Sequence, residues 1–187
     1  MHNTSMELMK IQAQALNLPL YTVTFPKQDP QLYGQRMANK MEEFKQKGIY
    51  TVASGDIFLE DSKNYREKKL KEAGITALFP LWKRNTKSLM VQFIEAGFKS
   101  VIINLDTHYL NAAWLGRTID KGFMANLAYN VDPCGENGEY HSFVYDGPNF
   151  QNAVQFSMKN KRHEGGIYTV DTICQDLEAQ KRTNLHF

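Results

Sequence analysis

The spacing of apolar residues predicts alternating helices and strands over the first hundred positions. Between Thr4 and Leu18, apolar residues recur every three or four positions, as on one face of a helix. Thr4 and Glu7 also have the spacing of a capping box, so we expect this helix to begin at Thr4. Short β-prone runs follow, in the order Leu20–Phe25, Ile49–Ser54, Thr76–Phe79 and Ser100–Leu105.

Three further helices are predicted between these strands, at Asp29–Gly48, Asp61–Gly74 and Thr86–Ala96, each beginning with a capping residue. The predicted helix Asp29–Gly48 has one apolar face, which consists of Tyr33, Met37, Met41 and Phe44. Strands separated by helices form right-handed βαβ units, so we expect residues 1–106 to be an α/β domain with an open parallel sheet. This pattern requires a strand before the first helix, which the sequence does not contain.

After Leu105 the pattern changes, and residues 107–187 are predicted to form a smaller α+β domain. Residues 107–128 are irregular and helical, with Trp114 and Phe123 as packing residues. Three strands are expected at His141–Tyr145, Ala153–Arg162 and Ile167–Leu177. The last two are joined by Glu164-Gly165-Gly166, which is a hairpin signal.

Composition narrows the class of protein. The chain is 42% apolar and 12% aromatic, which favours a packed interior over disorder. Its net charge of +2 gives no reason to expect a nucleic-acid partner. The two cysteines, Cys134 and Cys174, form neither a disulfide framework nor a metal motif, which indicates a reducing compartment. With no apolar run of membrane length and no signal-peptide pattern, we expect a cytoplasmic protein.

The densest chemistry lies in residues 131–148. Two carboxylates, Glu136 and Glu139, stand three positions apart among glycines, close to Cys134 and His141. Glycines allow positive φ and close backbone approach, so backbone N–H groups and carboxylates can converge on a ligand. The alternative is an acidic surface loop that leads into the strand beginning at His141, because such residues are common in turns.

A second group of candidates follows the predicted parallel strands, where ligands of open sheets bind. Asp56 comes after one strand and is suited to a ribose hydroxyl or a hydrated magnesium ion. Arg66 and Arg84 are suited to phosphate oxygens, and Trp82 to stacking on a base. Domain-interface packing for Trp82 and solvated surface for the arginines are the alternatives.

Several blocks of the sequence resemble one family. They are Gly55–Asp61, Tyr65-Arg66, Leu78–Trp82 and Asp132–Pro148. In this order and spacing, over residues 7–150, they resemble the diphthine–ammonia ligase family of ATP-pyrophosphatase-like (PP-loop) proteins, in its bacterial form. The resemblance implies an open parallel sheet of adenine nucleotide alpha hydrolase (Rossmann-like) type, N-terminally truncated here, followed by the smaller α+β domain.

The resemblance also implies a reaction. Family members use ATP, with Mg²⁺, to adenylylate a carboxylate, and ammonia then displaces AMP to give an amide. It implies nucleotide-binding roles for Gly55, Asp56 and Arg66, and catalytic roles for Glu136 and Glu139. The residues implied to bind substrate are Gly135, Asn137, Gly138, His141, Tyr145 and Trp82. The carboxylate, on a small molecule or a protein, is not identified by the sequence, and no covalent role is expected for Cys134.

The sequence departs from the family in two places. It contains no Ser-Gly-Gly-Lys-Asp-Ser motif, whose backbone cradles the ATP phosphates, and Asn137 replaces a glycine of archaeal and eukaryotic members. We therefore expect a chain that lacks about 40 residues of an ordinary domain. Such a chain is expected to bind ATP weakly and to fold poorly or form homo-oligomers through open strand edges. Two classes stay open, namely an ATP-dependent amide ligase and a non-catalytic binding protein.

Overall fold

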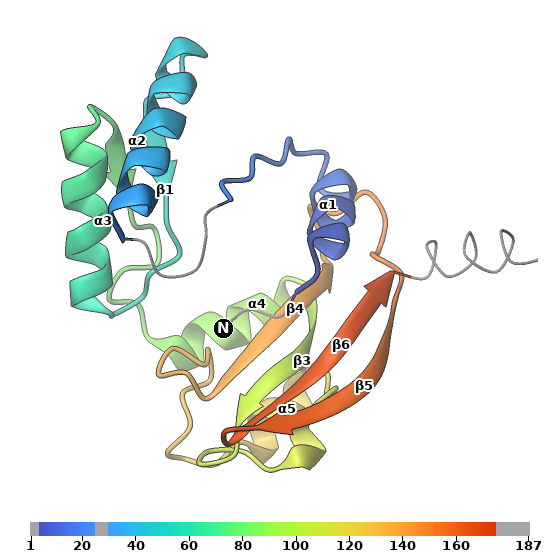
Figure 1. Cartoon of the computed structure of the whole chain (residues 1–187). Helices are drawn as coiled ribbons and strands as arrows, with labels where there is room; N and C mark the ends of the chain where they lie inside the picture. The colour runs from blue at the N-terminus through green and yellow to red at the C-terminus, as the bar shows by residue number, and fades with distance from the viewer. Residues whose placement is uncertain (1–3, 25–29, 175–187) are drawn as a thin grey trace, which may run out of the picture. The chain divides into compact units, whose positions relative to one another are not determined.

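A computed structural model describes residues 4–24 and 30–174, which belong to two compact units. The first, here called the 21–84 unit, extends from Tyr21 to Arg84. The second, called the sheet unit, combines residues 4–20 with residues 85–174. Figure 1 shows the strands of both units. In the described part of the chain, no helix combines the length and the apolar character needed to cross a membrane.

The 21–84 unit contains the predicted βαβ arrangement. Its elements are α2 (Pro30–Gln46), β1 (Thr51–Ala53), α3 (Glu60–Glu72) and β2 (Thr76–Leu78). Strands β1 and β2 pair in parallel, with Val52 opposite Ala77, which confirms the expected strand direction. Helix α2 is followed by Gly48 at φ 79°, a conformation that glycine adopts without steric cost. The described residues thus hold two strands of the predicted parallel sheet.

Two predictions for the 21–84 unit are wrong. Residues 20–24 are irregular rather than a strand, since β1 and β2 pair only with each other among the described residues. A strand without a neighbour leaves its backbone groups unpaired. Helix α3 begins after Leu59 without a side-chain cap, so Asp61 lies in the first turn, where its charge favours the helix dipole. Phe25 and Asp29, the predicted strand end and helix cap, lie outside the described residues.

The sheet unit is built on four antiparallel strands in the order β4-β3-β6-β5. They are β3 (Lys99–Asp106), β4 (Tyr140–Asp146), β5 (Phe156–Glu164) and β6 (Ile167–Cys174). The predicted hairpin is confirmed, and its turn places Gly165 and Gly166 at φ 56° and 81°. Strand β3, predicted to be parallel, pairs antiparallel with both β4 and β6. Along the chain, the boundary between the two described units falls after Arg84, whereas the sequence pattern predicts a domain boundary after residue 106.

The helices of the sheet unit are α1 (Met6–Ala15), α4 (Thr86–Glu95), η1 (Ala112–Trp114) and α5 (Lys121–Asn126). Two predicted caps are displaced by one residue. Ser5, rather than Thr4, accepts the N–H of Leu8 at 3.2 Å. Asn85 accepts the N–H of Ser88 at 2.9 Å, so Thr86 is the first helical residue instead of the cap. In each case the capping side chain bonds the N–H three residues ahead, as an N-cap requires.

The core of the sheet unit is centred on β3, whose residues from Ser100 to Leu105 are all buried. Phe123 is fully buried and packs edge-on against Trp114 at 5.5 Å and Tyr140 at 5.7 Å between ring centroids. The predicted packing roles of Trp114 and Phe123 are therefore confirmed. Because β4 pairs directly with β3, this core fixes the start of β4 and the loop that precedes it.

Candidate functional site

The glycine-rich loop before β4 is organised around the carboxylate of Glu139, which is fully buried. One oxygen, Oε1, accepts the backbone N–H of Asp132 at 2.9 Å and the Nδ2 group of Asn137 at 3.0 Å. The other, Oε2, accepts the backbone N–H of Asn137 at 2.9 Å. Glu139, predicted to face substrate, thus has its side-chain hydrogen bonds within the loop.

Asp132 and Tyr140 hold the rest of the loop. Oδ1 of Asp132 accepts the backbone N–H groups of Cys134 at 2.8 Å and Glu136 at 3.4 Å. The buried hydroxyl of Tyr140 donates to the carbonyl of Pro133. Burial, followed by the charges nearby, raises the pKa of the Tyr140 phenol, so it stays a hydrogen-bond donor. These bonds fix the backbone on both sides of the predicted substrate residues.

Gly135 is required by the loop geometry. Its φ is +70°, and a Cβ there would lie 2.7 Å from the carbonyl oxygen of Tyr140. Gly138 also has a positive φ of +88°, but a Cβ there would meet no atom within 4 Å. The first glycine therefore permits a close backbone approach, while the second permits only the turn.

Cys134 is a poor nucleophile in this loop. Its thiol donates to the carbonyl of Thr86 at 3.4 Å. Burial, together with the charges of Asp132 and Glu136, raises its pKa to about 12. Because the thiolate is the reactive form, the thiol is unreactive near neutral pH. This agrees with the expectation that Cys134 has no covalent role.

The loop presents three predicted residues at its outer side. Asn137 and Gly138 are exposed, and Glu136 is partly exposed. His141 lies within β4, where it pairs with Asn104 of β3, and is also partly exposed. The structure therefore brings Glu136 together with the glycine turn.

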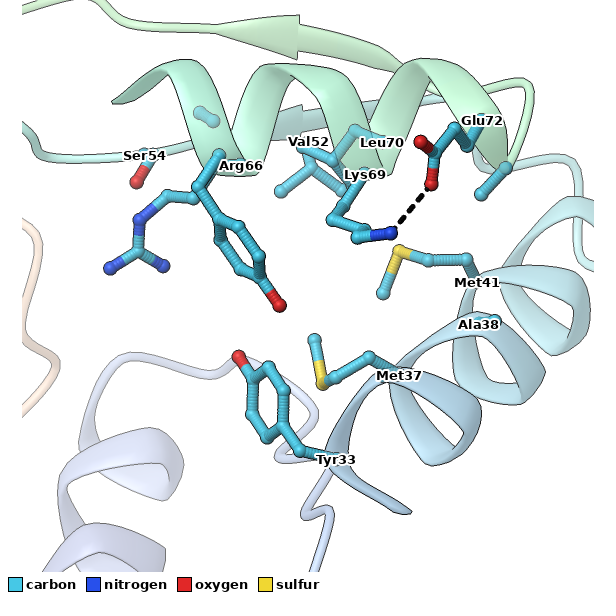
Figure 2. Close-up of a pocket in the computed structure, with 14 residues that line it drawn as sticks. Tyr33, Met37, Ala38, Met41, Val52, Ser54, Arg66, Lys69, Leu70 and Glu72 are labelled. Atoms are coloured by element: carbon cyan, nitrogen blue, oxygen red, sulfur yellow. Dashed lines mark hydrogen bonds and ion pairs between the residues drawn. The ribbon is translucent and has the colours of Figure 1, made fainter. Parts of the chain in front are cut away.

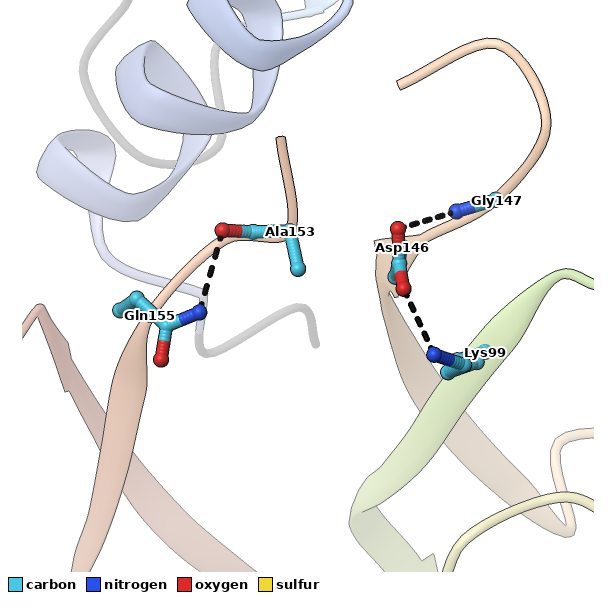
Figure 3. Close-up of polar contacts among 5 residues, drawn as sticks. All are labelled: Lys99, Asp146, Gly147, Ala153 and Gln155. Atoms are coloured by element: carbon cyan, nitrogen blue, oxygen red, sulfur yellow. Dashed lines mark hydrogen bonds and ion pairs between the residues drawn. The ribbon is translucent and has the colours of Figure 1, made fainter. Parts of the chain in front are cut away.

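Two further residues of the block 132–148, Tyr145 and Asp146, belong to β4. Tyr145 packs its ring against Phe156 at 5.4 Å. Asp146 accepts the ammonium group of Lys99 at 2.8 Å and the N–H of Gly147 at 2.9 Å, as Figure 3 shows. The hydrogen bond from Lys99 lowers the pKa of Asp146. The ion pair between Lys99 and Asp146 thus holds the end of β4 beside the start of β3.

The predicted nucleotide residues come together in the 21–84 unit. After β1, the hydroxyl of Ser54 donates to Oδ2 of Asp56 at 2.6 Å. The guanidinium Nε of Arg66 lies 3.1 Å from the same oxygen. The Asp56 side chain is 10% exposed and that of Arg66 is 52% exposed, so Arg66 can also reach a ligand. Gly55, between Ser54 and Asp56 in the sequence, has open space where a Cβ would stand.

The same unit contains a cavity of about 350 Å³, shown in Figure 2. It lies among α2, α3 and β1 and is lined mainly by apolar groups, including Met37, Met41 and Val52. Polar lining groups are Ser54, Arg66, the phenols Tyr33 and Tyr65, and an ion pair between Lys69 and Glu72 at 2.8 Å. A largely apolar cavity with a few polar groups is typical of small-molecule sites. Its signal in the sequence was the apolar face of the second helix.

Two further residues need comment, namely Trp82, which was predicted to bind substrate, and Asp106, which was not predicted to have a role. Trp82 packs edge-on against Phe79, with ring centroids 6.5 Å apart, within the 21–84 unit. Asp106, at the end of β3, accepts the backbone N–H and Nδ1 of His108 at 2.8 and 2.6 Å, and these bonds lower its pKa. The N–H of Asp106 donates to the carbonyl of Glu139, which ties the loop to β3. Asp106 directly follows the predicted strand Ser100–Leu105, and this position was a signal in the sequence that was not used.

Comparison with known proteins identifies the class of the sheet unit. Residues 85–175 match the sequence model of the diphthamide synthase C-terminal domain. The chain is 28% identical to a human diphthine–ammonia ligase over 160 residues, which are 77% of this chain and 60% of the relative. It is 26% identical to the Schizosaccharomyces pombe diphthine–ammonia ligase over 115 residues, or 59% of this chain and 19% of the relative.

These matches support the resemblance to the diphthine–ammonia ligase family that was inferred from the sequence motifs. The mouse diphthine–ammonia ligase is likewise 26% identical over 160 residues, which are 60% of its length. The chain thus spans less than two thirds of the curated relatives that it matches.

The sequence resemblance implies ATP with Mg²⁺, and a magnesium ion is held by oxygen ligands. Among the described residues, no three histidine, cysteine or carboxylate side chains gather as a set of metal ligands. Magnesium that accompanies a nucleotide is typically held by one or two carboxylates and by the phosphates themselves. Asp56 fits such a partial role, because its carboxylate follows β1 beside Arg66.

Proposed function

We propose that the chain is an amide-forming ligase of this family, acting on a carboxylate not yet identified, on a small molecule or a protein. The observation that carries the proposal is the ordered loop of the sheet unit, in which partly buried hydrogen bonds hold Glu136 beside an exposed glycine turn. This loop lies within the residues that match the family's C-terminal domain. A loop fixed in this way can position a substrate with little loss of entropy on binding.

The reaction has two steps. An oxygen of the substrate carboxylate attacks the α-phosphorus of ATP, and pyrophosphate leaves with the electrons of the broken P–O bond. The nitrogen of ammonia then attacks the acyl carbon, AMP leaves, and a proton is released from nitrogen. Positioning and stabilisation of charge account for most of the catalysis in such reactions.

We assign Glu136 to the ammonia and substrate side. Its carboxylate is partly exposed, and it can accept a hydrogen bond from ammonia and receive the proton released when the amide forms. Asn137 and Gly138, both exposed, are assigned to contact the substrate, although the N–H groups of Asn137 donate to Glu139 and that of Gly138 donates to the carbonyl of Gly135 at 3.1 Å. His141 is assigned to the same side, from its place near the start of β4.

We assign the nucleoside to the cavity of the 21–84 unit. The thioethers of Met37 and Met41 adapt to planar ligands, and the phenol rings of Tyr33 and Tyr65 offer aromatic faces and hydroxyl groups. Arg66, half exposed at the cavity, is suited to a phosphate oxygen, and Asp56 beside it to a ribose hydroxyl.

A non-catalytic binding protein is the second candidate. The two candidates share the nucleoside cavity and the substrate loop, and they differ in whether pyrophosphate is released.

Formation of a labelled amide tests the ligase proposal. The full chain is incubated with excess ATP, ¹⁵N-ammonium and a carboxylate-containing cell extract, and mass spectrometry then seeks ¹⁵N-amides while AMP is quantified. We expect a ¹⁵N-amide and AMP in equal amounts, and a rate about 10²-fold lower in Glu136→Gln. Glu164→Gln, an exposed carboxylate of the hairpin, is the matched control and should leave the rate unchanged. Nucleotide binding without AMP or amide would favour the non-catalytic candidate.

A further inference from the structure

The carboxylate of Glu139 is fully buried, and the ion pairs found among the described residues do not include it. An ionised group in such surroundings is unfavourable unless hydrogen-bond donors replace the water it has lost. Three N–H donors supply that replacement, two from Asn137 and one from Asp132. A carboxylate accepts hydrogen bonds at both oxygens, so it matches this set of donors.

The donors stand at the two ends of the loop. Asp132 opens the loop and Asn137 lies five residues later, so the carboxylate clamps the segment between them. Glu139 is itself fixed, because its carbonyl accepts the N–H of Asp106 at the end of β3. The clamp therefore fixes the segment that carries Glu136 relative to the sheet.

We propose that Glu139 is a positioning residue, which fixes residues 132–138 so that Glu136 faces the substrate while Glu139 itself contacts no ligand. This inference rests on the proposed function for the role of Glu136, but the clamp itself can be measured without any reaction. It assigns different tasks to the two carboxylates, although the sequence presents them as an equivalent pair.

Substitutions of Glu139 distinguish a clamp from general packing. In Glu139→Gln, an NH₂ group replaces one acceptor oxygen and meets a backbone N–H or the Asn137 amide, so two donors face each other. Glu139→Asp keeps the charge but shortens the side chain by one methylene, so it cannot reach both ends of the loop. Glu164→Gln, on the exposed hairpin, is the matched control.

Amide hydrogen exchange, followed by NMR in the full chain, tests the proposal without ATP or substrate. In the wild type, the N–H groups of Asp132 and Asn137 should exchange slowly. In Glu139→Gln and Glu139→Asp they should exchange about tenfold faster or more, as expected for loss of one hydrogen bond, while amides of Ile102 and Phe143 keep their rates. Glu164→Gln should change none of these rates.

Two results would overturn the proposal. One is unchanged exchange at Asp132 and Asn137 in both Glu139 variants, which would show that the carboxylate does not hold the loop. The other is a uniform acceleration that includes Ile102 and Phe143, which would show a general contribution to stability instead of a local clamp. Either result leaves the ¹⁵N-amide test of the ligase function unaffected, so the two proposals fail separately.

Discussion

Cys134 illustrates how burial decides what a reactive side chain can do. In the sequence it lies in a glycine-rich loop beside two carboxylates, without the base that activates a catalytic thiol. In the structure, burial and the charges of Asp132 and Glu136 raise its pKa to about 12. Its partner is the carbonyl of Thr86, which is far away in sequence and could not be inferred from local pattern.

The shifted pKa of Cys134 predicts a pH dependence of stability. The pKa of the unfolded thiol is near its ordinary value of 9.0 and that of the folded thiol is about 12, so the unfolded state loses its proton first as the pH rises. The contribution of Cys134 to stability is therefore complete below pH 9 and declines toward pH 12. Measured by urea denaturation, the free energy of unfolding of Cys174→Ser should decline between pH 9 and pH 12. This decline should be smaller when Cys134 is also replaced by serine.

Reaction with a thiol reagent gives an independent check of the same shift. In the Cys174→Ser background, Cys134 should react slowly at neutral pH, because the thiolate is scarce. Rapid modification of the folded chain at neutral pH would contradict the assigned pKa.

At the scale of elements, periodicity predicted most helices and strands but not every strand pairing. The spacing around Met37 and Met41 gave α2, and the run from Ser100 to Leu105 gave most of β3. The antiparallel pairing of β3 with β4 and β6 was not predicted, because strand direction depends on residues 35 or more positions away. The clamp at Glu139 was missed for a related reason, since its donors are mainly backbone N–H groups that any residue provides.

The glycine-rich loop gives a matched pair of substitutions. Gly135→Ala and Gly138→Ala both place a side chain at positive φ, which costs about 1–2 kcal/mol. Only Gly135→Ala also brings a Cβ to 2.7 Å from a backbone oxygen, that of Tyr140. Urea denaturation should show Gly135→Ala to be the less stable variant by about 1–3 kcal/mol. Equal losses would mean that the loop moves away from Tyr140 at little cost.

For the whole molecule, the sequence blocks predicted the family and the groups that the structure assembles. Asp56 and Arg66 are in contact, and Glu136 lies beside the exposed glycine turn. The cavity of the 21–84 unit was not predicted, because it depends on how α2, α3 and β1 pack together. We propose it as the nucleoside site because its lining includes Arg66 of the predicted nucleotide motif.

Calorimetric titration of the full chain with adenosine and with ATP and magnesium tests this account most directly. The proposal that the cavity holds the nucleoside, with Arg66 as the main phosphate ligand, predicts that ATP binds at most about tenfold more tightly than adenosine, or 1.4 kcal/mol. Tyr33→Ala should weaken both by about tenfold, whereas Tyr50→Ala, an exposed tyrosine outside the cavity, should change neither. Absence of saturable adenosine binding, or binding unaffected by Tyr33→Ala, would contradict the account.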